Sequence, residues 1–238
     1  MSSKHVLIVG GSSGIGFATA AKLLAQGFKV TIAGRSAEKL AAAQSALSGE
    51  VFTISLNAAD LSSLTTVLSH VGYIDHLVLA FGSGKGVGPF STIDVENVRL
   101  GFEEKVFPHF ACAQAALAQL APHGSITFIS AVTAQAAMPG TAGIGAANAA
   151  IAALVPTLAS ELRPRRVNAV SPGIIDTPWW DFLTHEQKTG LFNDYASQTP
   201  VGRIGKAEDV AHVIDFLITN SFVTGQVVVC DGGLQLGK

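Results

Sequence analysis

The segment Val9–Gly16, which reads VGGSSGIG, constrains the fold of this chain more than any other. It follows the apolar run His5–Val9 and leads into Ile15–Gln26, where apolar residues recur at helical spacing until Gly27 stops the helix. Its glycines permit a tight turn, let a pyrophosphate approach the backbone, and let helix pack closely on strand. The N–H groups at the start of the helix attract phosphate. We therefore predict dinucleotide binding here, rather than an ordinary glycine-rich turn.

Short apolar runs alternate with helical patterns along the rest of the chain. Ala37–Leu47 is a second helical segment, and alanine clusters further on indicate closely packed helices. Near-continuous apolar strands separated by helices predict an α/β fold with a parallel, doubly wound sheet covered by helices on both faces. The predicted strands are His5–Val9, Lys29–Ala33, Glu50–Leu56, His76–Ala80, Ser125–Ser130, Arg166–Ser171 and Val227–Cys230.

Composition excludes several other classes of protein. Hydrophobic residues make up 48% and charged residues 13% of the 238 residues, which rules out a disordered chain. The formal net charge of −2 gives no attraction to nucleic acid or to an anionic membrane, and no 18-residue apolar run is present. Seven scattered histidines predict no metal site, and two cysteines indicate a reducing compartment. We expect a soluble cytoplasmic protein.

One segment, at about residues 176–202, departs from the alternating pattern. It contains both tryptophans and follows the sixth predicted strand. Ligands of such folds bind at the carboxyl ends of the strands, so the insertion predicts a lid over an apolar or aromatic small molecule. Its aromatic residues would serve equally well to pack the insertion on the body of the protein.

Four motifs together resemble those of the short-chain dehydrogenase/reductase family. They are the glycine motif, Asp60 after the third strand, VNAVSPGIIDTP at 167–178 and TGQVVVCDGG at 224–233. The resemblance implies a seven-stranded Rossmann sheet in a single domain spanning residues 1–238. It also implies a nicotinamide cofactor and a homodimer or homotetramer.

The end of the second strand indicates which cofactor is bound. In NAD-binding members of the family an acidic residue at the position of Gly34 holds the ribose 2′-hydroxyl. Here that acid is missing, and Arg35 can pair with a 2′-phosphate, helped by the hydroxyls of Ser36 and Ser12. A solvated surface arginine is the alternative interpretation. We favour NADP(H).

The resemblance also assigns the remaining cofactor contacts. Asn57 is placed near the adenine, and two residues of the 167–178 motif are placed beside the nicotinamide carboxamide. The full predicted set is Gly10, Ser12, Ser13, Gly14, Ile15, Gly16, Arg35, Ser36, Asn57, Gly82, Asn148, Pro172, Gly173, Ile175 and Thr177.

The catalytic positions depart from the family pattern. Members use an Asn–Ser–Tyr–Lys tetrad, in which tyrosine transfers the proton. Aligned through the flanking motifs, this chain has Lys105, Ala131, Ile144 and Asn148 at those positions. Its two tyrosines are not followed by lysine four residues later, so no shift of register restores the pair. The chain resembles an atypical branch that keeps the nucleotide site and lacks the Ser, Tyr and Lys.

Lys105 is the candidate replacement for the missing proton donor. Burial near a nicotinamide would lower its pKa, although a lysine with a packed stem and a solvated head is an equally good interpretation. His109 follows at i+4 and is the second candidate, with a packed or surface histidine as its alternative.

We therefore predict an NADP(H)-dependent oxidoreductase acting on a small carbonyl, alcohol or imine with a non-standard proton donor. Two other classes remain open. One is a non-redox isomerase or cyclase on the same scaffold, and the other is a catalytically inactive NADP-binding protein. Consumption of NADPH distinguishes the first class from the other two.

Overall fold

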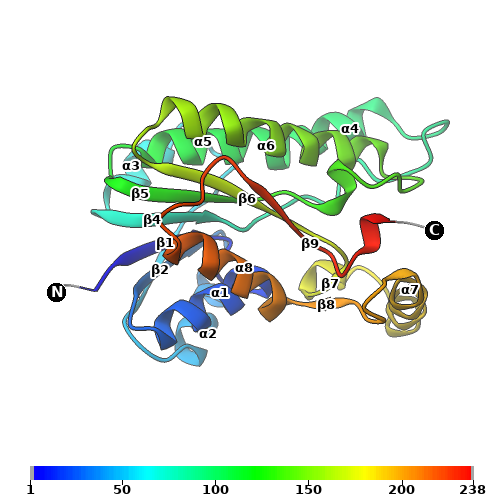
Figure 1. The fold of residues 1–238 in the computed structure, drawn as a ribbon, viewed down its shortest axis with the longest axis horizontal. Coiled ribbons are helices and arrows are strands. Elements are labelled where there is room, and N and C mark those ends of the chain that lie inside the picture. The colour runs from blue at the N-terminus through cyan, green and yellow to red at the C-terminus, as the bar shows by residue number, and fades with distance from the viewer. Residues whose placement is uncertain (1–2, 237–238) are drawn as a thin grey trace.

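A seven-stranded parallel sheet runs through the computed structural model, which describes residues 3–236 (Figure 1). The strand order is β3-β2-β1-β4-β5-β6-β9, so the chain winds outward from β1 in both directions. The doubly wound fold predicted from the sequence is thus confirmed. The strands are β1 (His5–Val9), β2 (Lys29–Gly34), β3 (Val51–Ser55), β4 (Ile74–Leu79), β5 (Leu120–Ile129), β6 (Arg166–Pro172) and β9 (Val227–Cys230).

Helices cover both faces of this sheet (Figure 1). One layer holds α1 (Gly14–Ala25), α2 (Ala37–Ala46) and α8 (Ala207–Thr219). The other holds α3 (Leu64–Ser69), α4 (Val95–Gly101), α5 (Phe107–Ala116) and α6 (Ala142–Glu161). Three short helical turns complete this part of the molecule, namely η1 (Phe102–Val106), η2 (Val132–Ala134) and η4 (Leu234–Leu236).

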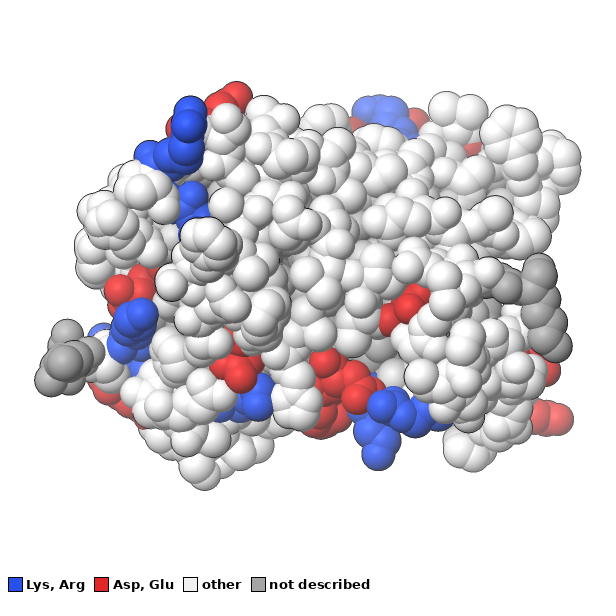
Figure 2. Space-filling model, viewed as in Figure 1, with Lys and Arg blue, Asp and Glu red and all other residues white. Residues whose placement is uncertain are grey.

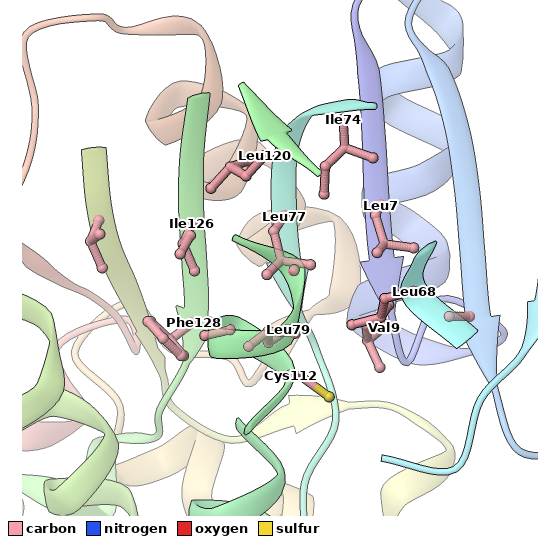
Figure 3. Packing of buried hydrophobic residues seen from close by; sticks show 14 of the residues in the cluster. Leu7, Val9, Leu68, Ile74, Leu77, Leu79, Cys112, Leu120, Ile126 and Phe128 are labelled. Carbon is pink, nitrogen blue, oxygen red and sulfur yellow. The ribbon is translucent and has the colours of Figure 1, made fainter. Parts of the chain in front are cut away.

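Side-chain alternation in β1 shows how the two layers are joined to the sheet. Val6 and Ile8 pack into the apolar cluster under α1, α2 and α8, whereas Leu7 and Val9 pack into the cluster under α3, α5 and α6 (Figure 3). All four side chains are almost fully buried. Full burial of such a side chain is worth about 1.5–3 kcal/mol, so both faces of the central strands contribute to stability.

The structure corrects some predicted element boundaries. Helix α5, formed by one of the alanine clusters, ends at Ala116, and β5 starts at Leu120, which pairs with Ile74 of β4. Two short strands that the sequence analysis did not predict, β7 (Ile175–Asp176) and β8 (Gly205–Lys206), pair with each other. They bracket the insertion, which contains η3 (Pro178–Trp180) and α7 (His185–Gln198).

Helix α6 is 20 residues long and has a mean hydropathy of 1.6, enough by length and composition to cross a membrane. It is the one such helix among residues 3–236, and 44% of its apolar window is buried inside the protein. Its side chains Ile151 and Val155 pack into the core beneath it. These contacts are those of a core helix that also has an exposed apolar side.

We expect Gly16→Ala to destabilise the protein strongly, because a Cβ at this position of α1 would collide with the backbone of Gly10. The matched control is Gly190→Ala in α7, where a Cβ meets nothing within 4 Å. Both glycines are helical, so the gain in helix propensity, about 1 kcal/mol, is common to the two variants. Urea unfolding should show loss of stability for the first and a small gain for the second. Equal stability of the two variants would contradict the close packing of α1 on β1.

Candidate active site

The glycine turn after β1 is built by close backbone contacts. Gly10, at φ +86°, donates from its N–H to the carbonyl of Ala33 over 2.8 Å, and a Cβ on it would lie 2.6 Å from the carbonyl oxygen of Ala80. Gly14 also has a positive φ, of +53°. Ser13, the N-cap of α1, makes no side-chain cap bond, so the first N–H groups of this helix are free to bind an anion.

The end of β2 lies beside this turn. Ser12 Oγ is 3.5 Å from the position that a Cβ on Gly34 would occupy. Ser36 caps α2 by accepting a hydrogen bond from the N–H of Lys39 over 3.2 Å. Arg35 is exposed and forms no ion pair with any residue in the described part of the chain. The structure therefore brings Ser12, Gly34 and Ser36 together, with an unpaired guanidinium next to them.

The segment after β6 meets the glycine turn from the other side. A Cβ on Gly14 would lie 3.3 Å from the side chain of Thr177. Gly173 donates from its N–H to the carbonyl of Cys230 over 3.0 Å, and Ile175 is buried as part of β7. Asn57, by contrast, is exposed in the loop after β3, where its side chain accepts a hydrogen bond from the N–H of Ala59.

Lys105 is buried, with 6% of its surface exposed. Its Nζ donates to the carbonyl oxygen of Ser130 over 3.4 Å and lies 4.0 Å from the position of a Cβ on Gly82, the loop residue after β4. No carboxylate within residues 3–236 forms a salt bridge with it. Because burial disfavours the charged form, the pKa of Lys105 falls to about 8.

The helix that carries Lys105 is locally widened. Residues Phe102–Val106 form a π-helical turn, which has i→i+5 hydrogen bonds. Turns of this kind are frequent at functional sites.

His109 follows Lys105 by one helical turn and lies in the core. Its ring packs against Phe81 at 4.0 Å between centroids and stacks on Phe128 at 6.2 Å, and none of it is exposed. Its Nδ1 bonds to the backbone carbonyl of Lys105 over 2.8 Å. Burial, followed by the charge of Lys105, lowers the pKa of His109 to about 3. These contacts give His109 a packing position and keep it neutral.

Asn148 is buried in α6, at the position where the family resemblance expects lysine. Its Nδ2 donates to Oγ1 of Thr133 over 3.0 Å, and its backbone carbonyl accepts a hydrogen bond from Ser130 Oγ over 2.9 Å. Its Oδ1 has no hydrogen-bond partner among the described residues. A buried acceptor without a partner is costly, which marks this oxygen as a place where a ligand can donate a hydrogen bond.

Ala131 and Ile144, the other two positions of the expected tetrad, carry no group that transfers protons. Ile144 lies in the first turn of α6, and its N–H donates to the carbonyl of Gly86 over 2.9 Å. A Cβ on Gly143 would lie 2.7 Å from that same carbonyl oxygen. This glycine-to-glycine contact presses the loop after β4 onto α6, an arrangement that the sequence analysis did not foresee.

The insertion carries an aromatic cluster above these loops. Trp179 meets Trp180 edge to face at 4.5 Å between centroids, and Phe182 and Phe192 join them. Trp180 Nε1 donates to the carbonyl of Ile175 over 2.9 Å. Trp179 lies 3.8 Å from the position of a Cβ on Gly84, so the insertion touches the loop after β4.

A shallow, largely open cleft of about 640 Å³ runs along the segment between β5 and α6. Its lining is mostly apolar, and Thr133 and Thr141 are its side chains with hydroxyl groups. Within the described ranges no group of three or more His, Cys, Asp or Glu side chains is placed to hold a metal ion. The remaining lining residues are Phe90, Ala134, Ala136, Ala137, Met138, Pro139, Gly140, Ala142, Gly145, Ala146 and Ala149.

Comparison with known proteins identifies what this arrangement resembles. Residues 9–235 match the family model described as enoyl-(acyl carrier protein) reductase. The 3-oxoacyl-[acyl-carrier-protein] reductase of Thermotoga maritima is 34% identical over 258 residues, which cover 99% of each chain.

Two solved structures share the fold over nearly their whole length. A small-chain dehydrogenase in complex with NADPH aligns with a TM-score of 0.85 and 30% identity, covering 99% of this chain and 100% of that one. The MalC reductase/Diels-Alderase of Malbranchea aurantiaca aligns with a TM-score of 0.89 and 26% identity, covering 99% and 97%.

We expect Lys105→Met to stabilise the protein by a few kcal/mol at pH 7. The methionine keeps an apolar stem and removes a buried cation that lacks a carboxylate partner. The unfolded lysine titrates near 10.5 and the folded one near 8, so unfolding takes up a proton between these values and the native protein gains stability as pH rises through them. The difference in unfolding free energy between variant and parent should therefore narrow from pH 7 to pH 10.5. Urea unfolding at pH 7 and pH 10.5 measures this difference. A difference that does not change with pH would show that the surroundings of Lys105 do not disfavour its charged form.

Proposed function

The chain belongs to the short-chain dehydrogenase/reductase family, and from that premise we propose that it is an NADP(H)-dependent oxidoreductase acting on a small carbonyl, alcohol or imine. We propose further that it represents a branch of the family without the Ser, Tyr and Lys, in which Lys105 is the proton donor. The observation that carries this proposal is the buried Lys105 amine beside the loop after β4.

The residues of the site fit a nicotinamide dinucleotide. The glycine turn and the uncapped start of α1 offer N–H groups to a pyrophosphate. The unpartnered Oδ1 of Asn148 is suited to accept a hydrogen bond from a ribose hydroxyl of the nicotinamide half. When bound, the cofactor supplies or accepts the hydride. In this proposal a single nucleotide-binding domain holds the cofactor, and the segment at 176–202 covers the substrate.

The preference for NADP(H) rests on the end of β2. Gly34 carries no carboxylate, so nothing at this position repels a 2′-phosphate, and Arg35 has no competing ion-pair partner in the described part of the chain. A charge-assisted hydrogen bond to phosphate contributes about 1.5–3 kcal/mol. A solved relative whose printed description names an NADPH complex is consistent with this choice.

Lys105 has the properties required of a general acid at neutral pH. With its pKa lowered to about 8 it remains mostly protonated at pH 7, yet it is a stronger acid than an ordinary lysine. Its Nζ faces Gly82, in the loop that the family resemblance places next to the nicotinamide. Reduction of a carbonyl needs this proton on the oxygen, whereas an iminium substrate arrives already protonated.

A second candidate is a non-redox ring-forming reaction on the same scaffold. Among the solved neighbours is a protein named both a reductase and a Diels-Alderase, and three of the four tetrad positions here, Ala131, Ile144 and Asn148, cannot transfer protons. A shaped apolar cleft is what such a reaction requires. The assay below separates this candidate and the inactive binding protein from an oxidoreductase, since neither consumes NADPH.

We further propose that the protein assembles through α5 and α6, the helices on either side of β5 in the chain. Phe107 and Phe110 of α5 are about half exposed, and the exposed residues of α6 are small and uncharged apart from Glu161 at its end. Figure 2 shows few charges on the surface above these helices. Small residues let a second copy approach closely, as in a two-fold dimer or a tetramer. Free Cys112 and Cys230 suit a reducing cytoplasm, where we place the protein.

The cofactor proposal predicts that NADPH binds more tightly than NADH. Arg35→Ala should remove most of the difference, because it deletes the cation that meets the 2′-phosphate. Gly34→Asp should reverse the preference, since a Cβ there makes only ordinary contacts at 3.5 Å or more and the carboxylate repels a phosphate. Calorimetry of both cofactors on the three proteins measures this. Equal affinities in the parent protein would contradict the proposal.

The proton-donor proposal predicts that Lys105→Met lowers the turnover of a ketone by about 10²-fold or more, with NADPH affinity nearly unchanged. The probes are acetoacetyl-N-acetylcysteamine as the ketone and 2-methyl-1-pyrroline as the imine, followed by loss of NADPH absorbance. In the parent protein, ketone turnover should decline above pH 8 as Lys105 loses its proton.

Three results would count against parts of this proposal. Full ketone activity in Lys105→Met would assign the proton to water or to another group. Loss of activity on the imine equal to that on the ketone would indicate a role for Lys105 other than proton donation. NADPH binding with no consumption on either probe would favour the non-redox enzyme or the inactive protein.

The assembly proposal predicts a dimer or tetramer in light scattering at micromolar concentration. Ala153→Arg, at an exposed position of α6, should dissociate it, because a long cation would stand in the closely packed interface. The control Ala42→Arg places the same change on an exposed position of α2, away from α5 and α6. A monomeric parent protein would overturn the proposal.

A further inference from the structure

Thr133 is tied to the buried centre of the candidate site by its hydroxyl oxygen. Its Oγ1 accepts a hydrogen bond from Asn148 Nδ2 over 3.0 Å. A hydroxyl that accepts one bond still has its own proton to donate. No acceptor for that proton is found among residues 3–236. The hydroxyl is therefore held in place as an oriented donor without a partner.

Two other hydroxyl groups in this region, those of Ser130 and Ser171, already donate hydrogen bonds within the protein. Ser130 donates to the backbone carbonyl of Asn148 over 2.9 Å, and Ser171 donates to Oε1 of Gln135 over 3.2 Å. Position 131, where the family places its substrate-binding serine, is alanine. Thr133 is two residues further along the same segment and has a free donor.

Lys105 and Thr133 are connected through two intervening residues, Ser130 and Asn148. Lys105 Nζ bonds to the carbonyl of Ser130, whose hydroxyl bonds to Asn148, whose amide bonds to Thr133. The proposed acid and the free hydroxyl therefore flank one short polar connection between β5 and α6.

Thr133 is also accessible from outside. It is partly exposed and lines the cleft of about 640 Å³, whose other walls include Phe90, Met138 and Pro139. The backbone carbonyl of Thr133 presses on Gly145, where a Cβ would lie 2.6 Å from it, so the segment that carries the hydroxyl is fixed against α6. A molecule with an apolar body can occupy this cleft and present a polar atom to the hydroxyl.

From these contacts we infer that Thr133 is a catalytic residue that donates a hydrogen bond to the carbonyl oxygen of a substrate whose apolar body lies in the cleft. This inference rests on the proposed function and adds to it the group that binds the reacting oxygen. The bond strengthens as hydride addition to the carbonyl carbon drives charge onto the oxygen, and Lys105 then supplies the proton. Thr133 polarises the oxygen and keeps its own proton throughout.

The test compares Thr133→Val, which keeps the shape and removes the hydroxyl, with Thr133→Ser, which keeps the hydroxyl. Thr65→Val, at an exposed position of α3, controls for the chemical change itself. With acetoacetyl-N-acetylcysteamine and NADPH, the valine variant should lose roughly 10²-fold in kcat/KM. The serine variant should keep most of the activity, and all three should bind NADPH with unchanged affinity in calorimetry.

A binding measurement separates this inference from the proposed redox activity. Binding of 3-hydroxybutyryl-N-acetylcysteamine to the protein loaded with NADP⁺ is followed by calorimetry. The valine variant should bind this ligand about tenfold more weakly, the loss expected for one hydrogen bond, and the serine variant should not. This comparison stands even if the parent protein turns nothing over, in which case only the redox proposal fails.

Two outcomes would overturn the assignment of Thr133. One is a valine variant that matches the parent in both kcat/KM and ligand binding. The other is a serine variant that loses as much as valine, which would indicate a packing role for the threonine methyl group. If the parent protein neither binds nor reduces these oxygen-bearing probes, both the role assigned to Thr133 and the proposal of a carbonyl substrate are wrong.

Discussion

The close approach of two backbone segments at Gly10 and Gly16 is the constraint on which the rest of the site depends. No side chain fits between the turn after β1 and the first turn of α1, and Gly10 adopts a φ that favours glycine. This contact aims the start of α1 along the carboxyl edge of the sheet. The ends of β2, β4 and β6 then converge on the turn through Gly34, Ala80 and Thr177.

A second set of close contacts holds the catalytic side of the site. Gly86 rests on Gly143 and Ile144 at the start of α6, and the carbonyl of Thr133 rests on Gly145. The insertion meets the same loop through Trp179 and Gly84. These contacts leave little freedom in the loops around Lys105 and Asn148. Both side chains are buried, and each lacks one partner in the described part of the chain. The Lys105 amine forms no salt bridge with a carboxylate, and Oδ1 of Asn148 accepts no hydrogen bond. A structure that maintains such groups at a cost in stability points to a function for them.

The proposed replacement of the usual tetrad would change the electrostatics of the site. The family places a lysine in the helix after β5, and here Asn148 stands there while a lysine comes instead from the π-helical turn η1. In this proposal the positive group would come from a different helix than in the family pattern. Because Lys105 lacks a compensating carboxylate in the described part of the chain, its proton is held less firmly than that of a surface lysine.

The sequence by itself determined the fold and the nucleotide-binding half of the site. Apolar strands alternating with helices specify a covered parallel sheet, and VGGSSGIG marks a turn where backbone approaches backbone. Both signals are local patterns that can be read along the chain. The other half was decided by tertiary structure. The sequence left open whether His109 is packed or at the surface, and its contacts with Phe81 and Phe128 place it in the core. The link from Asn148 to Thr133, and the cleft beside it, join residues whose relation depends on how η2 packs on α6. Spacing along a chain predicts which residues share a helix or a strand, but hydrogen bonds between elements depend on side-chain directions that only the packed structure fixes.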